Sequence, residues 1–310
     1  MRQTRAITEG AVMLAVFTIL LLITLYFPIL SLISTFFLPL PFFLYNVRHS
    51  EKNSLPFFLA ALVLSFIVGN VVSISLAFTY GAVGWTMGWL VKKKESWNTT
   101  LLVSSLVFAL STVIQYAIAV TVFQFDFIKE TMTLVRSSYE QSIQLLKRLG
   151  QQPPADMMNQ INDMLELIQT LIPSFIVMAS IMAVFFIQLI LFPIVRRFQV
   201  EVPKRTPFRN IQMPKNILWY YLVTLVLTLV LNPEKGTTMF WVLFNLATIF
   251  GLLLFIQGCS FLLYYRYQKK LPTVFSFIFV LFALLFLPLV RLLGIIDLGF
   301  DLRKRIQTKA

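Results

Sequence analysis

Long apolar runs dominate the chain, and polar residues gather between them. Several runs have the length of about 20 residues that a helix needs to cross a bilayer. Apolar and polar residues do not alternate within them, as they do in the strands of a membrane barrel. Lipid offers backbone groups no partner, so such runs form helices. The sequence therefore predicts an all-α, polytopic helical membrane protein with about eight to ten transmembrane spans. We place nine spans, at 9–27, 29–47, 55–69, 71–91, 100–123, 172–195, 216–232, 238–265 and 272–290.

Proline and glycine mark the boundaries between neighbouring spans. The third and fourth spans share one apolar block of 36 residues, so we expect a turn near Gly69-Asn70. Pro28 separates the first two spans. Pro39 and Pro41 should bend the second, because each removes a backbone donor. The sequence Gly84-x-x-x-Gly88 predicts a close crossing of two helices.

The long polar stretch 126–170 has a helical pattern of its own. Apolar residues recur every three or four positions in 128–146 and again in 157–172, which indicates two amphipathic helices. "GQQPP" at 150–154 separates them, and Pro154 suits the first turn of the second helix. The helices form a hairpin or continue spans five and six. They lie on the lipid headgroups or cover a site from outside, and the sequence leaves both open.

Charge gives the expected orientation. The chain is 58% hydrophobic and 13% charged, with a net charge of +13 and a mean hydropathy of +0.81. The basic residues lie at the ends of apolar runs: 196–215 holds six against one acid, whereas 126–170 holds four against six. Cytoplasmic loops collect Lys and Arg, so we expect the N-terminus inside and 126–170 outside. Basic loops also attract anionic headgroups, and nothing here indicates nucleic acid as a partner.

The C-terminal tail does not fit this alternation. Nine crossings would leave Arg303, Lys304 and Arg305 outside. Either "LPLVRLLGIIDLGF" (287–300) dips back as a short re-entrant piece, or one earlier span is wrong. Asp297 lies near the membrane boundary, where a carboxylate needs a basic partner. We expect Arg291 or a basic loop in that role, with a fold at Gly294; the alternative is a solvated helix end.

Enzyme chemistry has few candidates. One His and one Cys, Cys259, form no His/Cys metal cluster and no internal disulfide. The chain has neither a GxxxxGK[ST] loop nor a Gly-x-Ser-x-Gly elbow. His49 flanks a basic loop, where we expect it to be solvated. We therefore predict no metal, no cofactor and no enzymatic activity, with an enzyme that uses Ser or Asp alone as the third alternative.

Polar residues within spans three to five form the candidate solute site. A polar group inside a membrane is costly unless it faces protein or water. These groups are neutral, hydrogen-bonding and placed in the outer half of the membrane, which suits a small polar solute. The alternative is that they join helices, as we interpret Gln188, Asn245 and Gln257. The candidates are Asn70, Ser73, Ser75, Thr79, Tyr80, Gln115 and Tyr116.

Over nearly its whole length the chain resembles the YybS-like family of bacterial membrane proteins. The resemblance rests on "AITEGAVMLA" near the N-terminus, "YGAVGWTMGWLVKKK", the "LIPSF" that opens span six, and the tail "GIIDLGFDLRKR". It implies a multi-pass protein of the bacterial plasma membrane. No activity is established for that family.

Residues 5–200 more distantly resemble the membrane substrate-binding (S) component of energy-coupling-factor transporters. That resemblance implies six helices, the first of which docks on an energising transmembrane subunit through Ala-x-x-x-Ala. Ala11 and Ala15 match this spacing, although ordinary packing within the chain is the alternative. S components lack both the 126–171 helices and the three spans after residue 215.

We therefore expect two domains. Residues 1–200 form an S-component-like domain with 126–171 as an extracytoplasmic insertion, and 201–310 form a C-terminal helical extension. The leading hypothesis is a solute-binding transport component of the cell membrane without its own ATPase. The runner-up is a non-transporting scaffold or regulator that binds a partner through its helices and basic loops.

Overall fold

The computed structural model describes residues 2–150 and 156–307, and every regular element within them is a helix. Seven of these helices are long and apolar enough to cross a membrane, or eight if one sharply bent pair counts as a span. The expected all-α, polytopic architecture is confirmed. The chain divides into two compact units, unit 1 (Met1–Phe127 and Ile176–Arg205) and unit 2 (Ile128–Phe175 and Thr206–Ala310).

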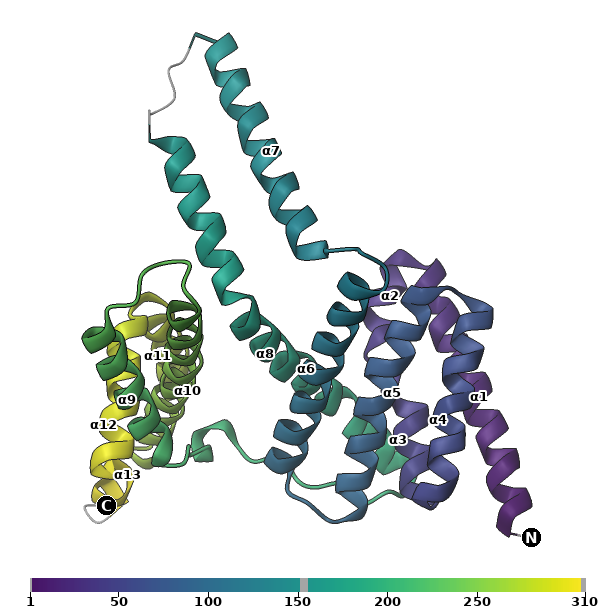
Figure 1. Ribbon diagram of the computed structural model, residues 1–310. Helices are drawn as coiled ribbons and strands as arrows, with labels where there is room; N and C mark the ends of the chain where they lie inside the picture. The colour runs from purple at the N-terminus through teal and green to yellow at the C-terminus, as the bar shows by residue number, and fades with distance from the viewer. Residues whose placement is uncertain (1, 151–155, 308–310) are drawn as a thin grey trace. The chain divides into compact units, whose positions relative to one another are not determined.

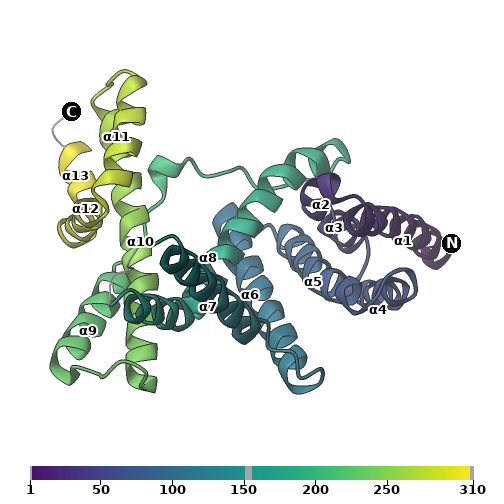
Figure 2. The same cartoon turned by 90° about the horizontal axis from the view of Figure 1, so that it is seen from above.

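Unit 1 is a bundle of apolar helices (Figure 1). Figure 2 views several of them nearly end-on. They are α1 (Arg2–Tyr26), α2 (Pro28–Thr35), α3 (Pro39–Arg48), α4 (Glu51–Val68), α5 (Val71–Lys92), α6 (Trp97–Thr121) and the last part of α8 (Met157–Arg197).

The predicted breaks between the helices of unit 1 are confirmed. Pro28 begins α2, and a turn over residues 36–38 breaks the second span just before Pro39. Proline is favoured in the first turn of a helix, where no backbone donor is needed. Gly69 ends α4, and Asn70 caps α5.

Helix α3 lies at the centre of the packing in unit 1. The side chains of Phe42 and Phe43 are buried in two apolar clusters that together draw on α1, α3, α4, α5, α6 and α8. Gly84 and Gly88 face α3 so closely that an added Cβ would lie 2.3 Å from the Pro39 oxygen and 2.8 Å from the Phe43 oxygen. The predicted close crossing is therefore confirmed, between α5 and α3.

Unit 2 contains the remaining elements. They are α7 (Phe127–Arg148), the first part of α8, the 3-10 helix η1 (Phe208–Asn210), α9 (Asn216–Leu231), α10 (Thr238–Gln268), α11 (Val274–Leu285), α12 (Leu287–Phe300) and α13 (Leu302–Gln307).

The two predicted amphipathic helices are present as α7 and the start of α8. Helix α8 is continuous over 41 residues, so the second amphipathic helix continues into span six, as one of the two alternatives predicted. The first amphipathic helix does not continue span five, because residues 122–126 separate α6 from α7. Of the predicted break at 150–154, Gly150 has a left-handed φ of +74°, and 151–154 lie outside the described residues.

Asn245 joins α10 to α8 where Pro173 interrupts the helical hydrogen bonding. Its carboxamide oxygen accepts from the Ser174 backbone N–H at 3.0 Å, and its amide nitrogen donates to the Thr170 oxygen at 2.7 Å. These two groups are four residues apart and normally bond each other in a helix. The interpretation of Asn245 as a link between helices is confirmed.

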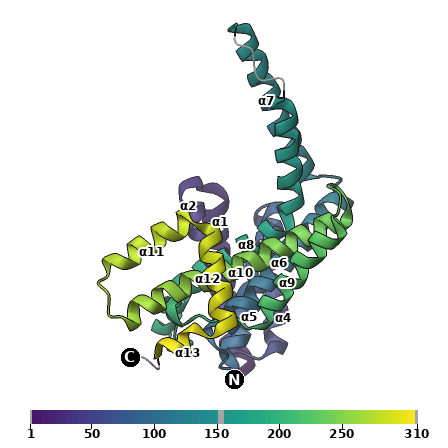
Figure 3. The ribbon, with the colours of Figure 1, turned by 90° about the vertical axis from the view of Figure 1, so that its left-hand side faces the viewer.

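The last apolar segment folds back on itself. Helices α11 and α12 meet at a bend of 109°, and Figure 3 shows α11 turning into α12. The two helices have 12 and 14 residues, or about 18 and 21 Å at 1.5 Å per residue, which is less than the about 30 Å of a hydrocarbon core. A bend of this size fits a broken span as well as a re-entrant piece, so the re-entrant alternative stays a prediction. The fold occurs at Phe286 and not at Gly294 as predicted.

Candidate functional site

The predicted solute residues Asn70 and Ser73 form a helix cap. The Asn70 side chain accepts from the Val72 N–H at 3.0 Å, and the Asn70 N–H donates to the Ser73 hydroxyl at 3.0 Å. This reciprocal arrangement satisfies donors that a helix N-terminus leaves unpaired. Both residues therefore have a structural reason to be polar.

Ser75, Thr79 and Gln115 connect α5 and α6. The Gln115 amide nitrogen donates to the Thr79 hydroxyl at 2.7 Å and to the Ser75 oxygen at 3.2 Å. Tyr80 packs edge-on against Phe108, and the Tyr116 hydroxyl donates to Asp126 at 2.9 Å. The structure thus brings Ser75, Thr79 and Gln115 together and leaves Tyr80 and Tyr116 with other partners. Their role toward a solute stays a prediction.

The small residues Gly10, Ala11 and Ala15 near the start of α1 lie in two different environments. Gly10 is buried, and an added Cβ would lie 3.3 Å from the Tyr45 ring. Ala11 and Ala15 are exposed on unit 1. Their exposure is what docking on another subunit requires, and docking itself stays a prediction.

A cavity lined by charged residues lies where several helix ends of unit 1 converge. It is an open cavity of about 1020 Å³, formed by the start of α1, the α3–α4 turn, the end of α5 and the segment after α8. We call it the basic cavity. Its charged side chains are Arg5, Glu9, Arg48, Lys92, Lys94 and Glu201, and His49, Asn53 and Gln199 add polar groups.

The ends of α5 and α8 bring polar residues to the basic cavity. After α5 the chain turns at Lys94, whose φ is +60°, and the Glu95 N–H donates to the Leu90 oxygen. After α8 it turns in the same way at Gln199, with a φ of +61°. Left-handed residues of this kind terminate helices by capping their free carbonyl groups. The sequence therefore stops both helices where their polar residues line the cavity.

Glu9 organises one wall of the basic cavity. Its carboxylate accepts from Arg48 and lies 3.1 Å from His49 Nε2. The Lys92 ammonium donates to the His49 backbone oxygen at 2.7 Å. His49 also packs on Tyr45, with ring centroids 4.5 Å apart, so its expected solvation is wrong: only 13% of its side chain is exposed.

The basic cavity has an excess of positive charge. Four cationic side chains face it against two carboxylates, one of which already pairs with Arg48. Lys and Arg donors favour phosphate and carboxylate groups. Among the described residues no group of three His, Cys, Asp or Glu is arranged to hold a metal ion. The surplus of cationic donors at this cavity is of the kind that suits small anions.

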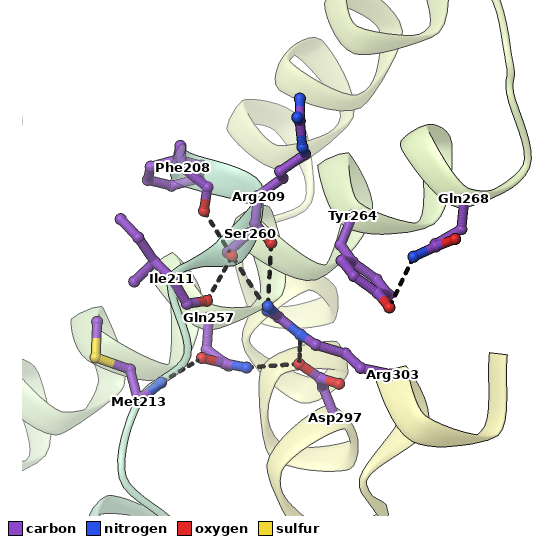
Figure 4. A network of polar contacts seen from close by, with 10 residues as sticks. All are labelled: Phe208, Arg209, Ile211, Met213, Gln257, Ser260, Tyr264, Gln268, Asp297 and Arg303. Atoms are coloured by element: carbon purple, nitrogen blue, oxygen red, sulfur yellow. Dashed lines mark hydrogen bonds and ion pairs between the residues drawn. The ribbon is translucent and has the colours of Figure 1, made fainter. Parts of the chain in front are cut away.

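A buried ion pair organises the polar interior of unit 2 (Figure 4). Asp297 is fully buried and accepts from Arg303 Nε at 3.0 Å and from the Gln257 amide at 2.5 Å. Arg303 also donates to the Ser260 hydroxyl and to the Arg209 oxygen. The Gln257 oxygen accepts from the Met213 N–H. One network thus connects α10, α12, α13 and the segment around η1, and Gln257 is confirmed as a link between helices.

The expected pairing of Asp297 with Arg291 is wrong, and so is the solvated alternative. Arg291 packs against Gly251 and reaches the Tyr221 hydroxyl at 3.4 Å. Arg303 takes its place because Asp301, with a φ of +48°, ends α12 in a left-handed turn that returns the chain toward Asp297. Asp301 itself pairs with Lys215 at 2.6 Å.

Fold and network together define a polytopic α-helical membrane protein with a sharply bent pair of helices, α11 and α12, near its C-terminus. Residues 15–298 match the family described as "Predicted membrane protein (DUF2232)". The chain is 32% identical over 311 residues to "Uncharacterized protein YybS" of Bacillus subtilis (strain 168), covering 99% of this chain and 100% of that protein. The chain belongs to this family. No solved structure matches it.

Proposed function

We propose that the protein is a membrane-embedded binding component that recognises a small polyanion at the basic cavity of unit 1. The observation that carries the proposal is the convergence of Arg5, Arg48, Lys92 and Lys94 on one cavity of about 1020 Å³. Ligand pockets commonly have volumes of about 300–1,000 Å³.

The arrangement of charges supports binding and not catalysis. Glu9 holds Arg48 and His49 in place, while Lys94 and Arg5 are exposed and available to a ligand. The positive-inside rule predicts that this end of unit 1 faces the cytoplasm. The ligand is then a cytoplasmic anion, and the protein is a receptor-like component of a larger assembly.

The experiment is a thermal-shift titration of the detergent-purified protein with two probes, inorganic pyrophosphate and citrate. We expect pyrophosphate or citrate to raise the melting temperature at low salt, and the shift to shrink as salt screens exposed charges. The stronger probe distinguishes a phosphate site from a carboxylate site. No shift with either probe at low ionic strength contradicts the proposal.

The second candidate is a transport component that binds a small solute and is powered by another subunit. Six of the seven apolar helices contribute to unit 1, the number that S components have, and Ala11 and Ala15 are exposed. Trp in place of both alanines should abolish co-purification of an energising subunit and leave folding intact. Leu59→Trp, on the exposed face of α4, is the control. A stable partner without any solute favours the non-transporting scaffold.

A further inference from the structure

A second cavity, in unit 2, has walls of a different chemistry. It is an open cavity of about 830 Å³ between α10, the hairpin of α11 and α12, and α13. Most of its lining is apolar or aromatic, and its two charged residues, Lys269 and Arg305, are both cationic. We call it the amphiphilic cavity. Its apolar and aromatic walls are Phe261, Leu262, Tyr265, Phe279, Leu293, Leu302 and Ile306.

The cavity follows from the way the hairpin is held. Helix α12 touches α10 backbone to backbone: an added Cβ on Gly294 would lie 1.9 Å from the Leu254 oxygen. The chain bends by 109° between α11 and α12, so α11 points away from this contact. Much of the apolar surface of α11, including Phe277 and Leu281, is exposed. Space therefore stays open between the tightly packed helix and the one that turns away.

The two cations line the cavity and lack acidic partners among the described residues. Lys269 follows the last turn of α10, where a helix dipole favours positive charge. Arg303 anchors α13 in the interior through Asp297, which positions Leu302 and Arg305 on either side of it at the cavity. Neither Lys269 nor Arg305 forms a salt bridge within the described part of the chain.

We propose that the amphiphilic cavity binds an anionic glycerophospholipid. Its phosphate contacts Lys269 and Arg305, and an acyl chain lies along Phe261, Phe279 and Leu293. Basic residues at the end of an apolar space between membrane helices are suited to anionic headgroups. A water-soluble anion leaves the apolar walls uncovered, and a zwitterionic lipid brings an additional positive charge toward the two cations. The site is separate from the basic cavity and does not depend on the ligand proposed there.

The test compares lipid retention in two double variants by native mass spectrometry, with added phosphatidylglycerol or phosphatidylcholine. Lys269→Gln with Arg305→Gln removes both cavity cations. Lys270→Gln with Lys304→Gln removes the same charge from neighbours that do not line the cavity. We expect the wild type and the control to prefer phosphatidylglycerol. The cavity variant should bind it about thirtyfold more weakly, at about 1 kcal/mol for each cation.

Two results overturn the proposal: equal retention of phosphatidylglycerol by both variants, or equal retention of the two lipids by the wild type.

Leu293→Trp tests the apolar wall independently, since the larger ring fills the space of an acyl chain. It should lower retention of phosphatidylglycerol while the melting temperature of the delipidated protein stays unchanged. Unchanged retention in this folded variant also contradicts the assignment.

Discussion

Arg303 Nε donates to Asp297 Oδ2 at 3.0 Å across the left-handed turn that joins α12 to α13. The side chain of Asp297 is 0% exposed and that of Arg303 9%. Gln257 of α10 donates to the same carboxylate oxygen. A charge pair in so apolar a protein is costly unless it is hydrogen-bonded, and this one fastens the tail to α10, on which α12 packs.

Removal of one charge of this pair should destabilise the protein more than removal of both. Asp297→Asn or Arg303→Gln leaves the partner's charge buried and unpaired, which should lower the free energy of unfolding by about 3–5 kcal/mol. The double variant leaves no unpaired charge in this place. The measurement is a double-mutant cycle on the free energy of unfolding in a detergent titration. If the two single effects simply add, the residues are not coupled.

The contact between α10 and α12 tolerates no side chain at Gly294. Gly294→Ala places a methyl group against the Leu254 backbone oxygen, and backbone cannot move away as a flexible side chain does. Gly299→Ala on the same helix meets only Leu218 at 3.7 Å, an ordinary contact. We expect a loss of about 1–3 kcal/mol for the first substitution and less than about 0.5 kcal/mol for the second. Equal melting temperatures of the two variants contradict this packing.

The ion pair between Asp301 and Lys215 gives a pH dependence in the acid range. The Lys215 hydrogen bond and charge hold the pKa of the Asp301 carboxyl below its ordinary 3.8. A lowered folded-state pKa adds stability above the unfolded-state value, and this is lost as the pH falls through the folded-state value. Asp301→Asn should therefore lower the melting temperature at pH 6 and have less effect near pH 3. A difference that grows toward low pH reverses the sign and contradicts the pairing.

We predict that the bent pair of α11 and α12 is re-entrant and brings the two ends of the C-terminal segment to one side of the membrane. Lys269 and Arg305 line the same cavity, although two short helices lie between them in the sequence. In a Cys259→Ser background, Lys270→Cys and Lys304→Cys should react with an impermeant maleimide from the same side of sealed vesicles. Labelling from opposite sides indicates a complete crossing in place of the hairpin.

Local sequence signals predicted the helices and their breaks well. Pro28, Pro39 and the Gly69-Asn70 turn act through the backbone of their own neighbourhood, so their effect is visible in the sequence. Gly84 and Gly88 likewise predicted a close helix crossing, but they did not identify α3 as the partner helix.

Partners of polar residues were harder to predict. Proximity in the sequence favours Arg291 as the partner of Asp297. Asp301 has a left-handed backbone conformation that redirects the chain, so Arg303 becomes the partner. Such a turn is hard to predict at a residue other than glycine, because few of these residues adopt a positive φ. The basic cavity was missed because Arg5, Arg48 and Lys94 come from three separate helix ends. The one available signal was Glu9, an isolated acid in the first apolar helix.

The most direct test of the proposed anion site is the dissociation constant for the stronger of pyrophosphate and citrate, measured by isothermal titration calorimetry at low salt. Arg5→Gln with Lys94→Asn removes two cavity cations, and Asn tolerates the left-handed φ of Lys94. The matched control is Lys52→Gln with Lys93→Gln, whose side chains do not line the cavity. We predict about thirtyfold weaker binding in the cavity variant and wild-type binding in the control. Equal affinity in the two variants contradicts an anion site in the basic cavity.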